Sequence, residues 1–228
     1  MQAALKKLQT MLEEGANVRE AIDMKRYLRY QFEFLGLKSP LRRTIHKKFR
    51  EGGVLELSTE EKLIAWVELL WRQPYREYQY IAMDDLASSR LLLTMKGAQV
   101  VERLITTSSW WDTVDILASN ILGEFYKTRP TELADKMLNE WRLSSDIWLN
   151  RTAIIVQLKY KTVIDLRLLK AAIQPHIEST EFFHQKAIGW ALREVTKTNP
   201  DWVKNYLKNN SLQPLSDREA MRWLRRNK

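Results

Sequence analysis

The chain has 228 residues, of which 45% are hydrophobic and 29% are charged, and its formal net charge is +9. Such a chain has room for one well-buried domain or one continuous repeat array, but hardly for two independent domains. The absence of cysteine excludes disulfides, thiol catalysis and cysteine-ligated metal centres. The positive charge favours a polyanionic partner, although charge alone does not distinguish such a protein from an ordinary basic one.

The N-terminal segment does not have the pattern of a targeting sequence. It is amphipathic, but it carries Glu13 and Glu14 and lacks an apolar core. No run of 18 apolar residues predicts a membrane span. The three histidines, His46, His176 and His184, lack metal-ligand spacings such as HExxH. We therefore expect a cytoplasmic protein that contacts no membrane and needs no metal or other cofactor.

The hydrophobic pattern is helical nearly throughout the chain. The nearest candidate for a strand, residues 54–57, is short. In "STEEKLIAWVELLWRQP" the apolar positions follow helical spacing, with a capping-box start at Ser58 and Glu61 and a stop at Pro74. A second capping-box pattern, "SDRE" at residues 216–219, predicts the start of a terminal helix through Trp223.

The predicted helices recur with a period in the middle thirties. Ala82, Ala118, Ala153 and Ala187 lie 36, 35 and 34 residues apart, and a leucine follows each after four or five residues. Two helices per such period are typical of a helical-repeat protein, in which one helix of each pair lines a concave surface. The competing interpretation is a chance spacing of alanines in a helical bundle. We predict an all-α helical-repeat solenoid that forms a single domain over residues 1–228.

The helices that would line the concave surface cover about residues 75–88, 110–126, 147–160 and 182–196. They carry cations interleaved with aromatic side chains. This pattern fits a nucleic acid, because Lys and Arg neutralise phosphates while aromatic rings contact sugar or base. The residues concerned are Arg76, Trp111, Asp115, Arg151, Lys159, Lys161, Lys186, Trp190 and Arg193.

One carboxylate in this groove is a candidate for chemistry. Trp111 and Asp115 are four positions apart, so they share a helix face. A carboxylate beside an indole is not ordinary core, because an unpaired buried charge is costly. The alternative is a structural bridge between repeats, in which Asp115 pairs with an arginine such as Arg151. Arg151 would then either form this bridge or bind a phosphate. Trp190 either faces the same groove or belongs to the core.

No other catalytic pattern competes with this one. The sequence has no Gly-rich phosphate loop, no GxSxG elbow and no paired carboxylates near two histidines. An enzyme with this sequence would have to work with one carboxylate, aromatic rings and cations.

Four segments of the chain are similar to one known family: "RYLRYQFEFLGLKSPLRR", "SWWDTVD", "IWLNRTAIIVQLKYK" and "EFFHQKAIGWALREVTKTNPDWV". They resemble the AlkD-type DNA alkylation repair proteins, and the resemblance runs from about Met24 to the C-terminus. It implies HEAT-like helical repeats curved around duplex DNA. It also implies a DNA glycosylase that removes cationic N3- and N7-alkylated purines without drawing the lesion into a base pocket.

The resemblance also assigns roles to particular residues. The family's catalytic aspartate matches Asp115, and its two deoxyribose-facing tryptophans match Trp111 and Trp190. Its phosphate-contacting arginine matches Arg151, and a tyrosine associated with DNA binding matches Tyr27. The expected partner is double-stranded DNA carrying alkylated purines. We expect a monomer, since an open groove must admit DNA.

Two other kinds of protein remain as alternatives. A protein-binding repeat scaffold would have a neutral or acidic groove, and the set of Lys and Arg on the predicted inner helices argues against it. A DNA-binding paralogue without catalysis would need the same basic groove as the glycosylase, so only activity distinguishes the two.

Overall fold

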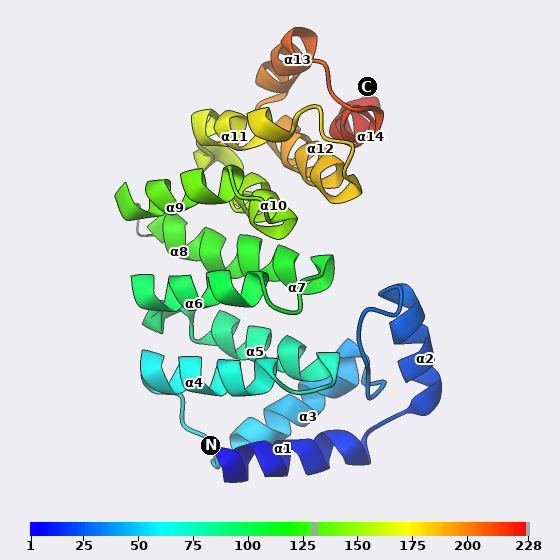
Figure 1. Cartoon of the computed structure of the whole chain (residues 1–228), viewed down its shortest axis with the longest axis vertical. Helices are drawn as coiled ribbons and strands as arrows, with labels where there is room; N and C mark the ends of the chain where they lie inside the picture. The colour runs from blue at the N-terminus through cyan, green and yellow to red at the C-terminus, as the bar shows by residue number, and fades with distance from the viewer. Residues whose placement is uncertain (129–131, 227–228) are drawn as a thin grey trace. The chain divides into compact units, whose positions relative to one another are not determined.

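The computed structural model describes residues 1–128 and 132–226, which form helices and connecting turns without a β-strand (Figure 1). The nearest feature to a sheet in these residues is an isolated parallel bridge between Glu33 and Tyr75. The predicted all-α fold is therefore confirmed, and it is consistent with a helical-repeat solenoid. None of the described helices is both long and apolar enough to cross a membrane.

The chain separates into two compact units, residues 1–97 and 98–228. The single repeat domain expected from the sequence stays a prediction. The helix α6 (Met95–Ile105) contains the boundary between the units.

In the first unit α4 packs on α5, and α3 contacts both α1 and α5. The apolar stripe predicted for α4 is buried, with Trp66 fully covered and Trp71 4% exposed. The helix begins one residue later than expected: the N-cap is Thr59, not Ser58, and its hydroxyl accepts from the Lys62 amide at 3.4 Å. The helices are α1 (Gln2–Glu14), α2 (Val18–Tyr27), α3 (Ser39–Glu51), α4 (Glu60–Trp71) and α5 (Arg76–Ser88).

A buried carboxylate shapes the turn that connects α2 to α3. Glu77 is fully buried and accepts hydrogen bonds from the amides of Leu35, Gly36 and Leu37 at 3.1, 2.9 and 3.0 Å. Gly36 has φ +88°, and a Cβ there would lie 2.0 Å from the carbonyl oxygen of Asn17, the N-cap of α2. Only glycine fits this position, and the turn thereby fixes α2, the helix that carries Tyr27.

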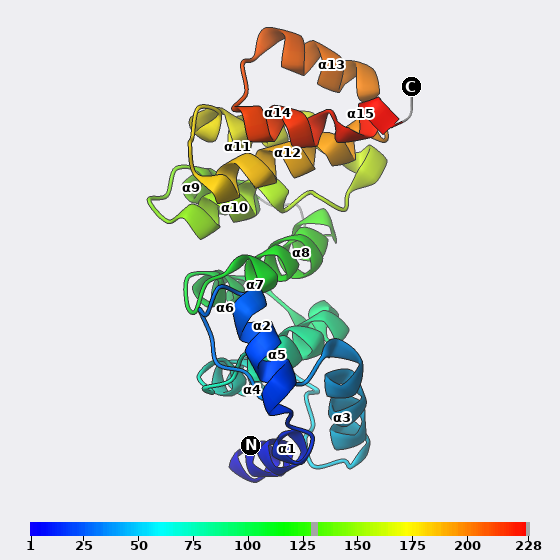
Figure 2. The same ribbon diagram turned by 90° about the vertical axis from the view of Figure 1, so that its right-hand side faces the viewer.

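In the second unit α10 packs on α9, α11 and α12, while α12 packs on α13 and α14. Figure 2 shows α14 running alongside α12. The helices after α6 are α7 (Trp111–Ile116), a π-helical segment (Leu117–Leu122), α8 (Gly123–Thr128), α9 (Glu132–Arg142), α10 (Ile147–Ile155), α11 (Leu166–Ile173), α12 (Phe182–Thr196), α13 (Pro200–Asn209), α14 (Pro214–Ala220) and α15 (Arg222–Arg226).

The alanines that marked the sequence period are core residues. Ala82 on α5, Ala118 in the π-helical segment and Ala187 on α12 are fully buried, and Ala153 on α10 is 5% exposed. A small side chain at these positions lets a neighbouring helix approach closely. The recurrence therefore reflects packing in corresponding places of successive helices.

The third predicted inner helix is shorter than expected. It was predicted over 147–160, but α10 ends at Ile155. Gln157 closes the following loop, because its side chain bonds both the amide and the carbonyl of Asp165, at 2.8 and 3.1 Å. As a consequence Lys159 lies in a turn, and Lys161 begins a 3₁₀ turn with φ +55°.

The terminal helix also differs from the prediction. It starts at Pro214, two residues before the expected cap, and it ends at Ala220 before the short α15. Ser216 is buried within it and donates to the carbonyl of Gln185 on α12 at 3.1 Å. The serine joins two helices and does not cap one.

Candidate active site

Trp111 and Asp115 lie one turn apart on α7, and both side chains are half-buried. The π-helical segment follows directly, and its Ser119 hydroxyl donates to the backbone carbonyl of Asp115 at 2.7 Å. Single π turns are rare and occur frequently at functional sites. Nothing in the hydrophobic pattern had predicted one here.

Arg151 on α10 holds the Asp115 carboxylate with two parallel hydrogen bonds. Its Nε donates to Oδ1 at 2.7 Å and its Nη2 to Oδ2 at 2.8 Å. The remaining Nη1 donates to the carbonyl of Phe183 on α12 at 2.6 Å. The Arg151 side chain is 1% exposed, whereas that of Asp115 keeps 19% of its surface in solvent.

This geometry bears on both interpretations of the pair. The bridge between successive repeats is present, and every nitrogen of the Arg151 guanidinium has a protein partner. These bonds use three of the five guanidinium N–H groups, and the Arg151 side chain is 1% exposed. The phosphate contact expected for Arg151 stays a prediction. Asp115 stays accessible despite this bridge, because 19% of its side-chain surface is exposed to solvent.

The electrostatic setting of Asp115 combines opposing effects. Burial raises the pKa of this carboxyl, and the charge of Asp112 adds to the rise, while the hydrogen bonds and charge of Arg151 oppose it. A perturbed carboxylate of this kind, half-buried beside aromatic rings, is a candidate functional group on physical grounds.

Trp190 on α12 lies against the same arginine. Its ring centroid is 5.2 Å from the Arg151 guanidinium carbon and 5.4 Å from the Lys186 ammonium. The side chain is half-buried, so it is neither a core tryptophan nor a fully exposed one. Both contacts are within the distance at which a cation is attracted by a ring face.

Two predicted DNA-binding cations share one acidic partner on α14. Glu219 accepts from Lys186 at 2.8 Å and from Arg193 at 2.7 Å, and Arg222 lies 3.9 Å away. Although burial works in the opposite direction, the Lys186 hydrogen bond and the three positive charges lower the pKa of Glu219. The sequence pattern had suggested Glu219 only as part of a capping box, so its contact with α12 was missed.

An aromatic cluster lies behind the arginine. Trp110, Trp148 and Phe183 pack with ring centroids 4.7 to 5.7 Å apart, and Phe183 is 5.9 Å from the Arg151 guanidinium carbon. The two adjacent tryptophans thus differ in role: Trp110 packs in this cluster, and Trp111 shares its helix face with Asp115. The spacing to Asp115 had singled out Trp111 from the sequence, whereas the packing of Trp110 was not predicted.

A family model for the DNA alkylation repair enzyme matches residues 8–224. The chain belongs to this family. It is also similar to a solved structure described as "Predicted DNA alkylation repair enzyme from Enterococcus faecalis", with a TM-score of 0.84 and 32% identity over 92% of this chain and 96% of that one. Among curated proteins no sequence matches. Membership of a DNA alkylation repair enzyme family implies that the substrate is DNA.

The remaining predicted site residues of this DNA alkylation repair enzyme family member lie on other elements than α7 and α12. Lys159 and Lys161 are exposed in the loop after α10. Tyr27, at the end of α2 in the first unit, is 71% exposed and borders an opening of about 230 Å³. The prediction that Arg76 contributes to a basic surface is wrong. Arg76 is 1% exposed, and its guanidinium carbon lies 3.6 Å from the centroid of the Phe32 ring.

Metal ligands do not gather in the part of the chain that the structure describes. No three His, Asp or Glu side chains there are placed to hold an ion. The expectation that the alkylation repair protein needs no cofactor stays a prediction.

Proposed function

We propose that this protein is a DNA glycosylase that hydrolyses the N-glycosidic bond of cationic N3- and N7-alkylated purines in duplex DNA. The observation that carries the proposal is the Asp115 carboxylate, whose side chain is 19% exposed and is held by Arg151, with the Arg151 guanidinium carbon 5.2 Å from the Trp190 ring centroid. Membership of the DNA alkylation repair family supports the substrate class.

The chemistry needs little from the protein. An N3- or N7-alkylpurine already carries positive charge, so its bond to the sugar is weak and the base leaves without a proton from an acid. The transition state has oxocarbenium character on the sugar, as in other glycoside hydrolyses. A fixed carboxylate stabilises that charge and orients or deprotonates the attacking water.

The clamp leaves Asp115 able to do this. A carboxylate oxygen has two lone pairs, and each oxygen of Asp115 accepts one hydrogen bond from Arg151. The second acceptor site of each oxygen remains for water or for the developing sugar cation. In this proposal Arg151 positions the carboxylate through its two hydrogen bonds to Asp115.

The tryptophans supply a second source of stabilisation. Trp111 shares the helix face of Asp115, and Trp190 borders the clamp from α12. A ring face attracts a cation by about 0.5–2 kcal/mol. The two indoles with the carboxylate would form an anionic, aromatic cradle for a sugar-centred cation.

Phosphate neutralisation would come from cations around this cradle. Lys186 and Arg193 on α12 remain partly exposed, at 21% and 22%, despite their shared carboxylate. Lys159 and Lys161 are exposed in the loop after α10. With Tyr27 of the first unit, these residues are the proposed DNA contacts of a monomeric enzyme that acts without a metal ion.

Excision under single-turnover conditions tests the proposal. Wild-type protein should release 7-methylguanine from a duplex, detected by alkaline cleavage at the abasic site, and should leave hypoxanthine essentially untouched, because the site has no acid to protonate a neutral leaving base. Asp115→Asn keeps the shape and removes the charge. It should slow release by about 10²–10³, the usual effect of losing one well-placed charge stabiliser.

Asp112→Asn is the matched control, because it removes the same charge from the same helix. An equal loss in this variant would assign the effect to net charge and not to the placement of Asp115. Binding of the lesion duplex by wild-type protein without any release would favour the alternative, a DNA-binding paralogue that does not excise bases.

A further inference from the structure

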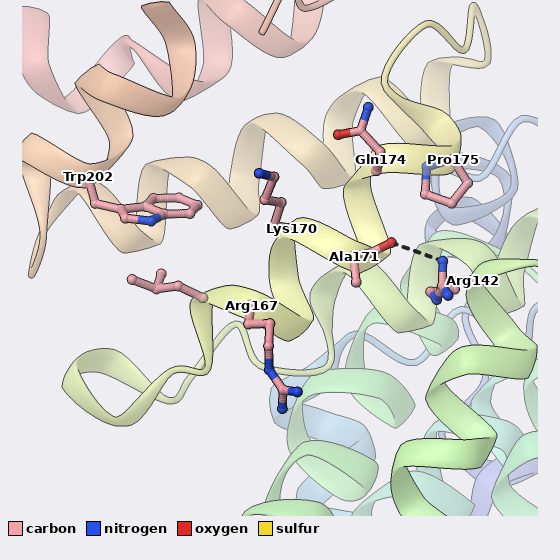
Figure 3. Close-up of a pocket in the computed structure, with 8 residues that line it drawn as sticks. Arg142, Arg167, Lys170, Ala171, Gln174, Pro175 and Trp202 are labelled. Carbon is pink, nitrogen blue, oxygen red and sulfur yellow. Dashed lines mark hydrogen bonds between the residues drawn. The ribbon is translucent and has the colours of Figure 1, made fainter. Parts of the chain in front are cut away.

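A pocket lies on other helices of the second unit than those of the proposed active site. This open pocket of about 700 Å³ lies over α11 and reaches the end of α9 and the first turn of α13 (Figure 3). The proposed active site uses α7, α10 and α12 instead. The lining residues are Arg142, Leu166, Arg167, Lys170, Ala171, Gln174, Pro175 and Trp202.

The exposed face of α11 forms the floor of this pocket. Arg167, Lys170 and Gln174 recur at helical spacing and line the pocket, whereas Leu169 and Ile173 between them are buried. The division follows the amphipathic pattern of a surface helix. All charged side chains of this face are positive, since no carboxylate is among the described residues that line the pocket.

The three cations of the pocket are weakly compensated. The Lys170 ammonium has no hydrogen-bond or ion-pair partner among residues 1–128 and 132–226. Arg167 is 3.5 Å from Asp165 in a largely exposed pair, and such pairs contribute little. Arg142 donates to the Asn139 side chain at 2.8 Å and to the Ala171 carbonyl at 3.5 Å, both neutral acceptors.

Trp202 provides a flat wall at one end. Its ring stacks on Tyr206, one turn along α13, with centroids 5.2 Å apart and planes at 16°. Tyr206 is 5% exposed, so this stack is anchored in the fold. With one indole face on Tyr206, the opposite face of the half-buried ring is available to the pocket that it lines.

We propose that this pocket binds a nucleotide, with its base stacked on Trp202 and its phosphate held by Lys170 and Arg142. Aromatic rings stack bases without regard to sequence, and Lys and Arg neutralise the phosphate. The same chemistry is offered by a free nucleotide and by an unpaired nucleotide within a DNA strand. The inference goes beyond the proposed glycosylase, because it concerns different helices and an unpaired ligand.

Binding of two ligands to the full chain tests this inference. The probes are thymidine 5′-monophosphate, followed by calorimetry, and a 5′-phosphorylated, fluorescein-labelled oligothymidylate, followed by anisotropy. Both are added with saturating undamaged duplex, so that the proposed groove is occupied. Trp202→Ala should weaken binding about tenfold or more, since stacking on one aromatic ring contributes about 1–3 kcal/mol per base. Lys170→Ala should weaken it several-fold.

Lys204→Ala is the control on the same helix, because its ammonium pairs with Asp201 at 3.0 Å outside the pocket, and it should bind as wild type does. Trp202→Phe keeps an aromatic ring stacked on Tyr206 and should retain most of the binding. This variant separates the loss of stacking from any disturbance of α13 that Trp202→Ala causes. Excision of 7-methylguanine should be unchanged in all of these variants. Nucleotide binding therefore tests the pocket, and excision tests the proposed glycosylase, independently of each other.

The two probes distinguish the sources of the ligand. Trp202-dependent binding of the monophosphate supports a free nucleotide, and such binding of the oligonucleotide alone supports an unpaired strand. Equal affinity of wild type and Trp202→Ala for both probes, or no binding of either, would overturn the inference.

Discussion

Arg151 makes three hydrogen bonds, and their acceptors lie on two different helices besides its own. Its bonds reach the carboxylate of Asp115 on α7 and the carbonyl of Phe183 on α12. A buried charge left without its partner is far more costly than the pair itself is stabilising. The stability of the site therefore depends on both charges being kept or both being removed.

We expect Arg151→Met to lower the free energy of unfolding by about 3 kcal/mol, the lower end for a broken buried pair, because Asp115 keeps some contact with solvent. Adding Asp115→Asn should restore part of this loss, since no uncompensated charge then remains. Urea denaturation of the four proteins in this double-mutant cycle measures the coupling.

Arg167→Met is the control for the loss of an arginine, because its side chain is 82% exposed, and it should change stability by no more than about 0.5 kcal/mol. A double variant no more stable than Arg151→Met alone would contradict the clamp.

Trp190 is the other residue whose role can be measured directly. We expect Trp190→Ala to slow excision of 7-methylguanine while lowering stability by clearly less than the roughly 3–5 kcal/mol of a buried tryptophan. The reason is that the ring is half-buried and contacts two cations. Thermal unfolding and single-turnover rates of one preparation decide the point. The fully buried Trp66, mutated in the same way, gives the reference for a core residue.

At the scale of elements, the sequence predicted the presence of helices more accurately than their first and last residues. Hydrophobic spacing placed α4, α10 and α12, because a buried stripe is a local property of the chain. The end of α10 depends on the bonds from Gln157 to Asp165, and the start of α14 on packing against α12. Contacts of this kind involve the folded chain and override a local pattern.

The same division applies to the candidate site. The family resemblance picked out Asp115, Trp111 and Trp190 from short motifs. The ion pairs of this site join residues that are 26 to 36 positions apart in the chain, as in Arg193–Glu219 and Arg151–Asp115. Short motifs do not record such pairings, so Glu219 was missed, and the Asp115–Arg151 pair entered the sequence analysis only as one of two alternatives.

Glu219 joins α14 to the cations of α12, and its removal should have two opposite effects. Glu219→Gln should tighten binding to undamaged duplex, because Lys186 and Arg193 lose the carboxylate that competes with phosphate. The slope of log K against log salt should steepen by about 0.9 per phosphate newly neutralised. Thermal stability should fall, because three cations lose a common partner.

Glu140→Gln makes the same change in net charge on α9, where Glu140 is 62% exposed and pairs with Lys136 at 3.9 Å. It should leave the melting temperature nearly unchanged. If both variants tighten DNA binding equally, the effect belongs to overall charge and not to the contact between α12 and α14.

At the scale of the whole molecule, the net charge of +9 should dominate the affinity for DNA. We expect binding to be nearly independent of base sequence, with log K falling linearly in log salt by about 0.9 for each phosphate neutralised. Anisotropy titrations of unrelated duplexes between low and moderate salt measure both properties. A strong preference for one sequence, or a flat salt dependence, would contradict phosphate-dominated binding.

The contacts of Arg151 also affect how the second unit opens. In repeat proteins each repeat interacts mainly with its neighbours, so terminal repeats fray while the middle stays folded. Arg151, however, links α7, α10 and α12, which belong to three successive helix pairs. Fraying of α12 removes one of the bonds that orient Arg151, and the disturbance reaches Asp115 two repeats away. These three helices would then open as one cooperative segment, and a partly unfolded chain would have no reactive centre with which to damage intact DNA.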